Sequence, residues 1–399
     1  MNKKILVINC GSSSLKYEVY SMPDRISLGK GLVERIGSSE GHLKQKSSKG
    51  LIEYQEPIEN HSQAMVLVIK ALTDKDDGVI TNLNDISAIG HRTVHGGEDY
   101  ASSILITDHV IQAIKNNIEL APLHNPANLI GIQESFKIFP DCPQVAVFDT
   151  AFHQTIPPAA YLYGLDRKFY DEYRIRRYGF HGTSHRYVSN EAMRLLKRSS
   201  ENTNVISCHL GNGASITSIV NGESRDTSMG FTPLEGLVMG TRSGDIDPAI
   251  VLYLLDKGFT KEQVNQELNK KGGMLGLSGI SNDMRDIRAA AKEGHTNAIQ
   301  ALEVYAHRIR RYVGAYAANM YRVDALIFTG GIGENDFEMR ERICHRLENL
   351  GIVMDYEKNK LMGNKEGLVS KGYSNTAILI IPTNEELQIA IDTFDIVFG

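Results

Sequence analysis

Two short apolar stretches around a polar turn open the chain. Ile5 to Ile8 form a continuous apolar run, and beyond the turn Leu15 and Tyr17 recur at alternate positions. A continuous run followed by alternation predicts a β-hairpin over residues 5–20. The first predicted element of the chain is therefore a hairpin.

The turn of this hairpin contains a glycine and three serines. On the second strand, a period of two places Ser12, Ser14 and Lys16 on the face opposite the apolar positions. Two hydroxyls and an ammonium beside a glycine turn suit a phosphate group. A serine-rich turn without any chemistry has the same pattern, so this stretch alone leaves both interpretations open.

The hairpin pattern recurs in the second half of the chain. The stretch "VINCGSSSLKYEV" has a partial echo in "VISCHLGNGASITSI" from Val205, and a third glycine-rich turn, "ALIFTGGIGEN", also follows an apolar strand. None of the three turns is a Walker A loop, and "GNGASI" lacks the third glycine of a dinucleotide fingerprint. We expect the three turns to surround one polyphosphate in an α/β fold made of two related halves.

The remaining pattern alternates strands with helices and contains no linker between the halves. The expected strands lie at 26–36, 41–56, 86–94, 144–149 and 377–382, and the expected helices at about 61–73, 107–119, 126–138, 297–321 and from 385. In the long helix, a stripe expected to form core or subunit contacts consists of Leu302, Tyr305, Ile309, Tyr312, Tyr316 and Met320. The repeat predicts one domain from 1–149 with 386–399 and a second from 150–385.

Composition excludes several classes of protein. The 399 residues carry a net charge of -5, with 42% hydrophobic and 23% charged residues, which is typical of a soluble globular protein of two or three domains. No basic run favours nucleic acid, and no apolar stretch favours a membrane or a signal peptide, so we expect a cytoplasmic protein. The four cysteines lie far apart and predict small buried residues, not a disulfide framework or a cysteine zinc site: Cys10, Cys142, Cys208 and Cys344.

Two pairs of histidines raise the alternative of a zinc metallohydrolase. His91 and His95 are four residues apart, as are His181 and His185, which is the spacing of a zinc-binding helix. The catalytic glutamate of that motif is missing from both pairs, and nearby glycines, among them Gly182, argue against a helix. A zinc enzyme therefore remains a remote alternative.

Nine motifs together resemble the acetate kinase family over essentially the whole chain. They are "VINCGSSSLK", "GHRTVHGG", "PLHNP", "VFDTAFH", "YGFHGTSH", "SCHLGNGAS", "MGTRSGDIDP", "FTGGIGEN" and "TNEE". The resemblance implies a duplicated actin-like ATPase fold, which is ribonuclease H-like, with two domains around an ATP cleft. It also implies a homodimer that reversibly transfers the ATP γ-phosphoryl to acetate, giving acetyl phosphate and ADP, with Mg²⁺, or Mn²⁺ in its place.

Acetate as the acceptor explains which side chains such a site needs. A carboxylate is already ionised at neutral pH, so the enzyme needs no general base. It needs positive charge to hold two anions in line and to neutralise developing charge, and the fork of arginine suits that task. The resemblance assigns these catalytic roles to Asn9, Arg92, Asp149, His181 and Arg242, although the arginines have salt bridges as a structural alternative.

The resemblance also assigns residues to the ligands. Those expected around acetate are Arg92, Val94, Leu123, His124, Phe180 and Pro233. Those expected around the nucleotide are Ser12, Ser14, Lys16, His209, Gly211, Asn212, Gly213, Asp283, Met284, Arg285, Gly330, Gly331, Ile332, Gly333 and Asn335. Those expected at the metal are Asn9, Asp149 and Glu385, with the two carboxylates on opposite sides of the cleft.

Two further alternatives concern the acceptor. One extra methylene is worth only about 1–3 kcal/mol in an apolar pocket, so a propionate kinase is the nearest alternative. An ATPase that moves or binds protein, like the actin and chaperone relatives, is more remote. Acyl phosphate formation separates both kinases from such an ATPase.

Overall fold

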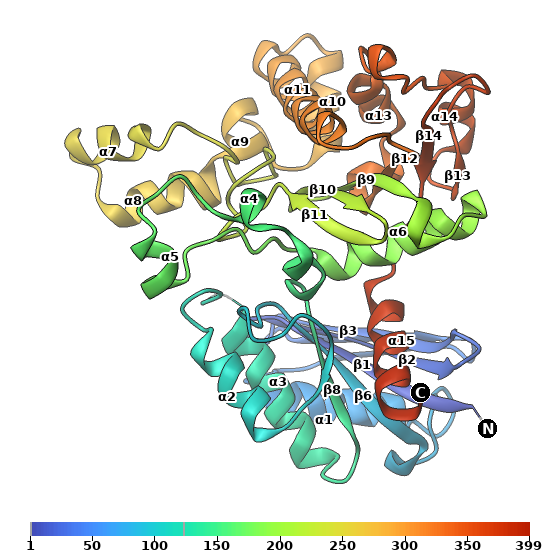
Figure 1. Ribbon diagram of the computed structural model, residues 1–399. Helices are drawn as coiled ribbons and strands as arrows, with labels where there is room; N and C mark the ends of the chain where they lie inside the picture. Colours follow the sequence, from blue (N-terminus) through green and yellow to red (C-terminus); the bar gives the residue numbers. More distant parts are fainter. Residues whose placement is uncertain (1, 123) are drawn as a thin grey trace. The chain divides into compact units, whose positions relative to one another are not determined.

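The computed structural model describes residues 2–122 and 124–399, which divide into two compact units. Unit 1 comprises Met1–Phe152 and Asn384–Gly399, and unit 2 comprises His153–Thr383. The domain boundaries expected from the repeat, after Asp149 and after Glu385, lie close to these changes of unit and stay a prediction. Each unit holds one sheet with helices on both faces (Figure 1).

Unit 1 contains an eight-stranded sheet in the order β5-β4-β3-β2-β1-β6-β8-β7. Its strands are β1 (Lys3–Cys10), β2 (Ser14–Met22), β3 (Ile26–Glu34), β4 (His42–Ser47), β5 (Leu51–Gln55), β6 (Ile86–Thr93), β7 (Ile104–Leu105) and β8 (Gln144–Phe148). Its helices are α1 (His61–Leu72), η1 (Leu83–Asp85), α2 (Asp108–Asn116), α3 (Asn125–Ile138) and α15 (Glu385–Phe398), and η2 (Ala151–Thr155) begins in this unit. The predicted hairpin over 5–20 is confirmed as β1 and β2.

The apolar run of β1 is buried on both faces of the sheet. Ile5 and Val7 share a core cluster with Ile389 of α15. Leu6 and Ile8 belong to the cluster on the opposite face, which α1 completes. A central strand that is covered on both faces needs a continuous apolar run, which is why β1 lacks the alternation seen in β2.

Unit 2 contains a six-stranded sheet in the order β11-β10-β9-β12-β14-β13. Its strands are β9 (Asn204–Leu210), β10 (Ala214–Val220), β11 (Glu223–Thr227), β12 (Ala325–Thr329), β13 (Gly367–Leu368) and β14 (Ala377–Ile380). Its helices are α4 (Pro158–Tyr161), α5 (Lys168–Tyr173), α6 (Gly182–Leu196), η3 (Ser200–Asn202), α7 (Ala249–Asp256), α8 (Lys261–Gln266), η4 (Glu267–Lys271), α9 (Gly273–Ser278), α10 (Met284–Lys292), α11 (Thr296–Ala318), α12 (Gly330–Asn335), α13 (Phe337–Cys344), η5 (Glu348–Leu350) and α14 (Tyr356–Met362).

The two sheets repeat the same core topology. In unit 1, three antiparallel strands, β3-β2-β1, are followed by β6 and β8 parallel to β1. In unit 2, β11-β10-β9 are followed by β12 and β14 parallel to β9. The duplication predicted from the glycine hairpins is therefore present in the order and direction of the strands.

The long helix α11 buries much of the predicted stripe. Leu302, Tyr305, Ile309 and Tyr316 are buried, and Val313 joins them. The core interpretation of this stripe is therefore confirmed for these four predicted positions. Among the described residues, no helix combines the length and apolar character needed to cross a bilayer.

All four cysteines are free thiols. Three of them are buried as predicted, and Cys142 is partly exposed. Burial raises the pKa of Cys142 to about 11 and that of Cys10 to about 12. These thiols are therefore protonated at neutral pH and behave as small apolar residues.

Candidate active site

Arg92 is the centre of a polar cluster in unit 1. It lies near the end of β6, and its Nη2 and Nε donate to the carboxylate of Asp149, directly after β8, at 2.5 Å and 3.2 Å. Nη1 lies 3.4 Å from Oδ1 of Asn9 in β1, and Nε lies 3.8 Å from Oε2 of Glu385 at the start of α15. The structure thus gathers three predicted residues, Asn9, Asp149 and Glu385, around the guanidinium of a fourth. Both carboxylates belong to unit 1, which corrects the expectation that they lie on opposite sides of a cleft.

Glu385 is buried beside other carboxylates, and Arg92 offsets these effects only in part. Burial raises the pKa of its carboxyl to about 7; Arg92 opposes this increase, and Asp149 and Glu386 add to it. Burial also opposes the charged form of Arg92, but Asp149 and Glu385 outweigh that effect and raise the pKa of the guanidinium. The raised pKa favours the protonated form of Glu385 more than in a solvent-exposed glutamate.

These oxygen donors fit a divalent cation. Mg²⁺ prefers carboxylate and carbonyl oxygens, keeps several waters and commonly uses only one or two protein carboxylates. Asp149, Glu385 and the amide oxygen of Asn9 supply such donors. Within residues 2–122 and 124–399, no group of three or more His, Cys, Asp or Glu side chains forms a metal site by itself, and a hydrated Mg²⁺ does not need one.

A chain of side-chain hydrogen bonds fixes His181 in unit 2. His181 is the N-cap residue of α6, in the left-handed conformation with φ 56°. Its Nδ1 lies 2.9 Å from Oγ of Ser215, which lies 2.7 Å from Nε2 of His185, and Nδ1 of His185 lies 2.9 Å from Oγ of Ser207. Burial lowers the pKa of His185 well below its ordinary value. A neutral imidazole donates at one nitrogen and accepts at the other, so His185 orients Ser215 and, through it, His181.

Ser207 and Ser215 were not predicted as functional residues, although the strand pattern contains a signal for them. Ser207 and His209 are two residues apart on β9, and Ser215 pairs with His209 across the hairpin, so the three lie on one face. The rings of His181 and His209 stack with centroids 4.3 Å apart, and Ser184 Oγ lies 2.8 Å from Nδ1 of His209. Polar residues at alternate positions of an otherwise buried strand are that signal.

Arg242 lies beside His181 and the glycine turn after β9. Nη1 of Arg242 donates to the carbonyl of Pro233 at 3.2 Å. A β-carbon placed on Gly213 would lie 3.5 Å from Nε2 of His181 and 3.7 Å from Nη1 of Arg242. Burial lowers the pKa of the Arg242 guanidinium, and no carboxylate of the described residues pairs with it. A partly buried cation without a counter-ion is costly, so an anion would complete this arrangement.

A cavity of about 670 Å³ in unit 2 begins at the same glycine turn. Predicted nucleotide-binding residues that line it are Gly211, Asn212, Asp283, Met284, Arg285, Gly331, Ile332 and Asn335. Three further lining residues were not predicted: Asn282, Arg288 and Asp336. Arg288 donates to Asp336 at 2.6 Å, and Asn282 donates to Oδ1 of Asn212 at 3.0 Å. Arg288 lies one helical turn after Met284 in α10, and this spacing is the signal that would have identified it.

The three glycines after β12 differ in why a glycine suits each position. Gly330 has φ 76°, and a β-carbon there would lie 2.8 Å from the carbonyl oxygen of Leu210, so the fold itself requires this glycine. A β-carbon on Gly333 would lie 3.3 Å from the Phe328 backbone. A β-carbon on Gly331 would meet nothing within 4 Å. Only Gly331 faces open space, where a ligand can approach the backbone.

The predicted acetate residues are distributed over both units. Val94 is buried in unit 1, and His124 is the N-cap residue of α3 in the same unit. Phe180 is buried in unit 2, where Pro233 accepts the hydrogen bond of Arg242. The predicted Leu123 lies outside the described residues.

The first glycine turn belongs to unit 1, whereas the cavity is lined by unit 2. Ser12 lies in the turn between β1 and β2, and Ser14 and Lys16 lie in β2. The amide of Gly11 donates to the carbonyl of Ser14 at 2.8 Å, which closes the turn. The assignment of Ser12, Ser14 and Lys16 to the nucleotide therefore stays a prediction.

The contacts of the paired histidines oppose the zinc alternative. Nε2 of His91 lies 2.7 Å from Oε1 of Gln144, and burial lowers the pKa of His91 to about 4. Both ring nitrogens of His185 lie against serine hydroxyls. Gly182 does not prevent a helix, contrary to the prediction, because α6 begins at this residue. The first residues of a helix have no intrahelical partner for their N–H groups, so a glycine there does not interrupt the helix.

Comparisons with known proteins agree over the whole chain. The acetokinase family profile matches residues 4–391. An acetate kinase of Desulfitobacterium hafniense is 55% identical over 396 residues, covering 99% of both chains. The crystal structure of Porphyromonas gingivalis acetate kinase superposes with a TM-score of 0.95 at 45% identity, covering 99% of this chain and 100% of that one. A propionate kinase of Francisella tularensis has a TM-score of 0.92 at 43% identity, with coverage of 99% and 100%. These matches confirm the predicted duplicated, actin-like ATPase fold.

Proposed function

The chain belongs to the acetokinase family, and on this premise we propose that its Arg242 and His181 bind the phosphoryl group that passes between ATP and acetate. The reaction is the reversible phosphorylation of acetate by ATP, giving acetyl phosphate and ADP. The observation that carries this proposal is the partly buried Arg242, which has no carboxylate partner among the described residues and lies beside Gly213 and His181. The cavity that begins at the same turn supports binding of the nucleotide there.

The chemistry asks these residues to position charge and not to remove a proton. Acetate is ionised at neutral pH and attacks the γ-phosphorus directly while ADP leaves. Arg242 offers two donors to the equatorial oxygens, and the Ser207, His185 and Ser215 chain orients His181 to donate a third. Fixed donors of this kind stabilise the developing charge without reorganising during the reaction.

In unit 1, we propose that Asp149 and Glu385 bind Mg²⁺, with Mn²⁺ as a substitute. The family generally uses a divalent metal, and the raised pKa of Glu385 supports a cation in this cluster. When bound, the cation supplies charge neutralisation for the phosphates. Arg92 lies between these carboxylates and Asn9, and we propose that it orients the acetate carboxylate.

The small apolar acceptor pocket consists, on this proposal, of Val94, Leu123, Phe180 and Pro233. Such side chains favour one methyl group, and the comparisons favour acetate over propionate as the acceptor. We also propose a cytoplasmic location, since the reaction draws on ATP.

We further propose that two copies of the chain associate through α7. This helix has no buried residue in unit 2, and the exposed fractions of Leu252 and Tyr253 are 64% and 59%. Ile250 and Leu255 are also exposed on the same helix. A helix of this apolar character is normally covered, and a second copy covers it symmetrically in a homodimer.

Replacement of Arg242 tests the proposed role most sharply. Arg242→Ala should lose about a hundredfold or more in kcat, as expected on removing a preorganised donor. Added guanidinium should restore part of the rate, because the folded site lacks only the charged fork. A folded Arg242→Ala enzyme with the wild-type kcat would reject the proposal.

A further inference from the structure

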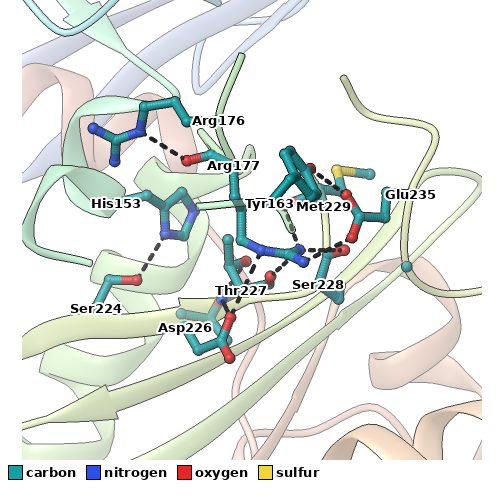
Figure 2. A network of polar contacts seen from close by, with 12 residues as sticks. His153, Tyr163, Arg176, Arg177, Ser224, Asp226, Thr227, Ser228, Met229 and Glu235 are labelled. Atoms are coloured by element: carbon teal, nitrogen blue, oxygen red, sulfur yellow. Dashed lines mark hydrogen bonds and ion pairs between the residues drawn. The ribbon is translucent and has the colours of Figure 1, made fainter. Parts of the chain in front are cut away.

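Arg177 holds an irregular segment at both of its ends (Figure 2). Its Nη1 donates to the backbone carbonyls of Thr227, Ser228 and Met229 at 2.7, 3.1 and 3.3 Å. Its Nη2 donates to Oε1 of Glu235 at 2.7 Å. One guanidinium therefore ties the beginning of the segment 227–235 to its end.

Tyr163 closes the cluster from the opposite side of Glu235. The Tyr163 hydroxyl donates to Oε2 of Glu235 and accepts from the amide of Phe231 at 2.9 Å. A β-carbon on Gly230 would lie 1.7 Å from Oε2 of Glu235 and 2.2 Å from the hydroxyl oxygen of Tyr163. The φ of Gly230 is not positive, so the backbone conformation does not require a glycine here. Glycine is needed because the side chains of Glu235 and Tyr163 pack directly against the backbone.

The cluster is connected to two residues of the proposed acetate pocket. The amides of Tyr178 and Gly179 donate to the carbonyl of Gly230 at 3.1 and 3.2 Å, which fixes the chain leading into Phe180. Pro233 lies within the segment that Arg177 ties together. The separation of Phe180 and Pro233 therefore depends on how the 227–235 segment is held.

Segment 227–235 is not held in place by a helix or a strand. Between the end of β11 at Thr227 and the start of α7 at Ala249, the chain forms no helix or strand. The side chain of Arg177 is only 15% exposed, and Asp226 adds a weaker ion pair at 3.9 Å from its Nε. Side-chain contacts from Arg177, Glu235 and Tyr163 take the place of a backbone ladder.

We propose that Arg177, acting with Glu235 and Tyr163, is a positioning residue that sets the separation of Phe180 and Pro233 and thereby the length of the carboxylate accepted. It touches neither substrate. The inference rests on the proposed placement of Phe180 and Pro233 beside the acetate methyl. Loosening the cluster enlarges this pocket and leaves the separate nucleotide cavity unchanged.

The test compares Arg177→Lys and Tyr163→Phe with a matched control. Lysine keeps the charge but cannot reach three carbonyls and a carboxylate at once, and Tyr163→Phe removes one hydroxyl and leaves the ring. Arg322→Lys is the control, because Arg322 also binds a carboxylate and a carbonyl, those of Asp324 and Asn202, in another part of unit 2. Steady-state kinetics with acetate and propionate give kcat and KM for each variant.

We expect the acetate-to-propionate ratio of kcat/KM to fall about tenfold in Arg177→Lys. One methylene in an apolar pocket discriminates between substrates by about tenfold or more, so this fall would remove a large part of the selectivity. The fall should be smaller in Tyr163→Phe, and KM for ATP should stay within about twofold of wild type in both. An unchanged ratio in a folded Arg177→Lys enzyme, or the same change in Arg322→Lys, would overturn the inference. If Arg177→Lys does not fold, an unchanged acetate-to-propionate ratio in Tyr163→Phe would overturn the inference instead.

A second pair of variants separates this inference from the proposed pocket. Phe180→Ala and Pro233→Ala should shift the ratio toward propionate if these residues touch the substrate. No shift in either variant would reject the pocket itself. A shift in these two without one in Arg177→Lys and Tyr163→Phe would reject only the positioning role.

Discussion

Binding of the metal and nucleotide should release a proton from Glu385. Burial and the neighbouring carboxylates raise the pKa of this carboxyl to about 7, although Arg92 opposes them. A divalent cation beside the carboxylate favours its ionised form and lowers the pKa again. The perturbation is therefore the addition of Mg²⁺ and ATP to the wild-type enzyme and to Glu385→Gln.

The size of the release follows from the fraction of Glu385 that is protonated before binding. With a pKa of about 7, that fraction is about one half at pH 7 and about one tenth at pH 8. Wild type should therefore release about half a proton more than Glu385→Gln at pH 7, and about a tenth more at pH 8. Protons lost by the nucleotide itself cancel in this difference.

Isothermal titration calorimetry in buffers of different ionisation enthalpy measures the number of protons released. Equal release by wild type and Glu385→Gln at pH 7, with both enzymes binding the nucleotide, would refute the reasoning. Such a result would mean that Glu385 is already ionised in the free enzyme or stays protonated beside the metal.

The same carboxyl should make stability depend on pH. Its pKa is higher in the folded chain than the ordinary value of 4.5, so its contribution to folding is fully present below pH 4.5 and is lost as the pH rises through 7. The free energy of unfolding should fall by about 3 kcal/mol over this range, at about 1.4 kcal/mol per pH unit. Urea unfolding followed by circular dichroism should show a flatter profile for Glu385→Gln than for wild type, and parallel profiles would contradict the assignment.

Three further variants test the roles of Arg92, Val94 and α7. Arg92→Ala should lower kcat by about a hundredfold or more while its circular dichroism stays that of wild type, because the charge beside acetate is lost; a wild-type rate would make Arg92 a structural salt bridge. Val94→Ala should raise the relative kcat/KM for propionate by about tenfold, and an unchanged ratio would mean that Val94 does not contact the acceptor. Leu252→Asp should shift the mass measured by sedimentation toward that of the monomer, whereas an unchanged mass would place the dimer contact outside α7.

The strands and hairpins were predictable because they depend on local patterns. The apolar run of β1, the alternation in β2 and the second glycine hairpin indicated two related sheets, and the strand order bears this out. Asn9 and Asp149 stand at or after the ends of parallel strands, which meet at one edge of a sheet, so their proximity followed from the same pattern. Glu385 joined them because α15 packs on this sheet, a long-range contact that no local pattern contains.

The supporting residues were not predictable in the same way. Arg177, Glu235 and Tyr163 are far apart in the chain and lie in segments with no periodic pattern, so nothing in their spacing indicates that they meet. His185 was considered only for its spacing from His181, and its hydrogen bonds to Ser207 and Ser215 depend on the fold of the β9–β10 hairpin. Motifs thus identified residues expected to touch ligands, and the tertiary structure was needed for the residues that orient them.

Trapping of the product with hydroxylamine shows directly whether the enzyme transfers the phosphoryl group to acetate. The enzyme is incubated with ATP, Mg²⁺ and either acetate or propionate, and the acyl hydroxamate and ADP are measured together. We expect one acetyl hydroxamate for each ADP and a higher kcat/KM for acetate than for propionate. Release of inorganic phosphate without hydroxamate, or a clear preference for propionate, would contradict this expectation.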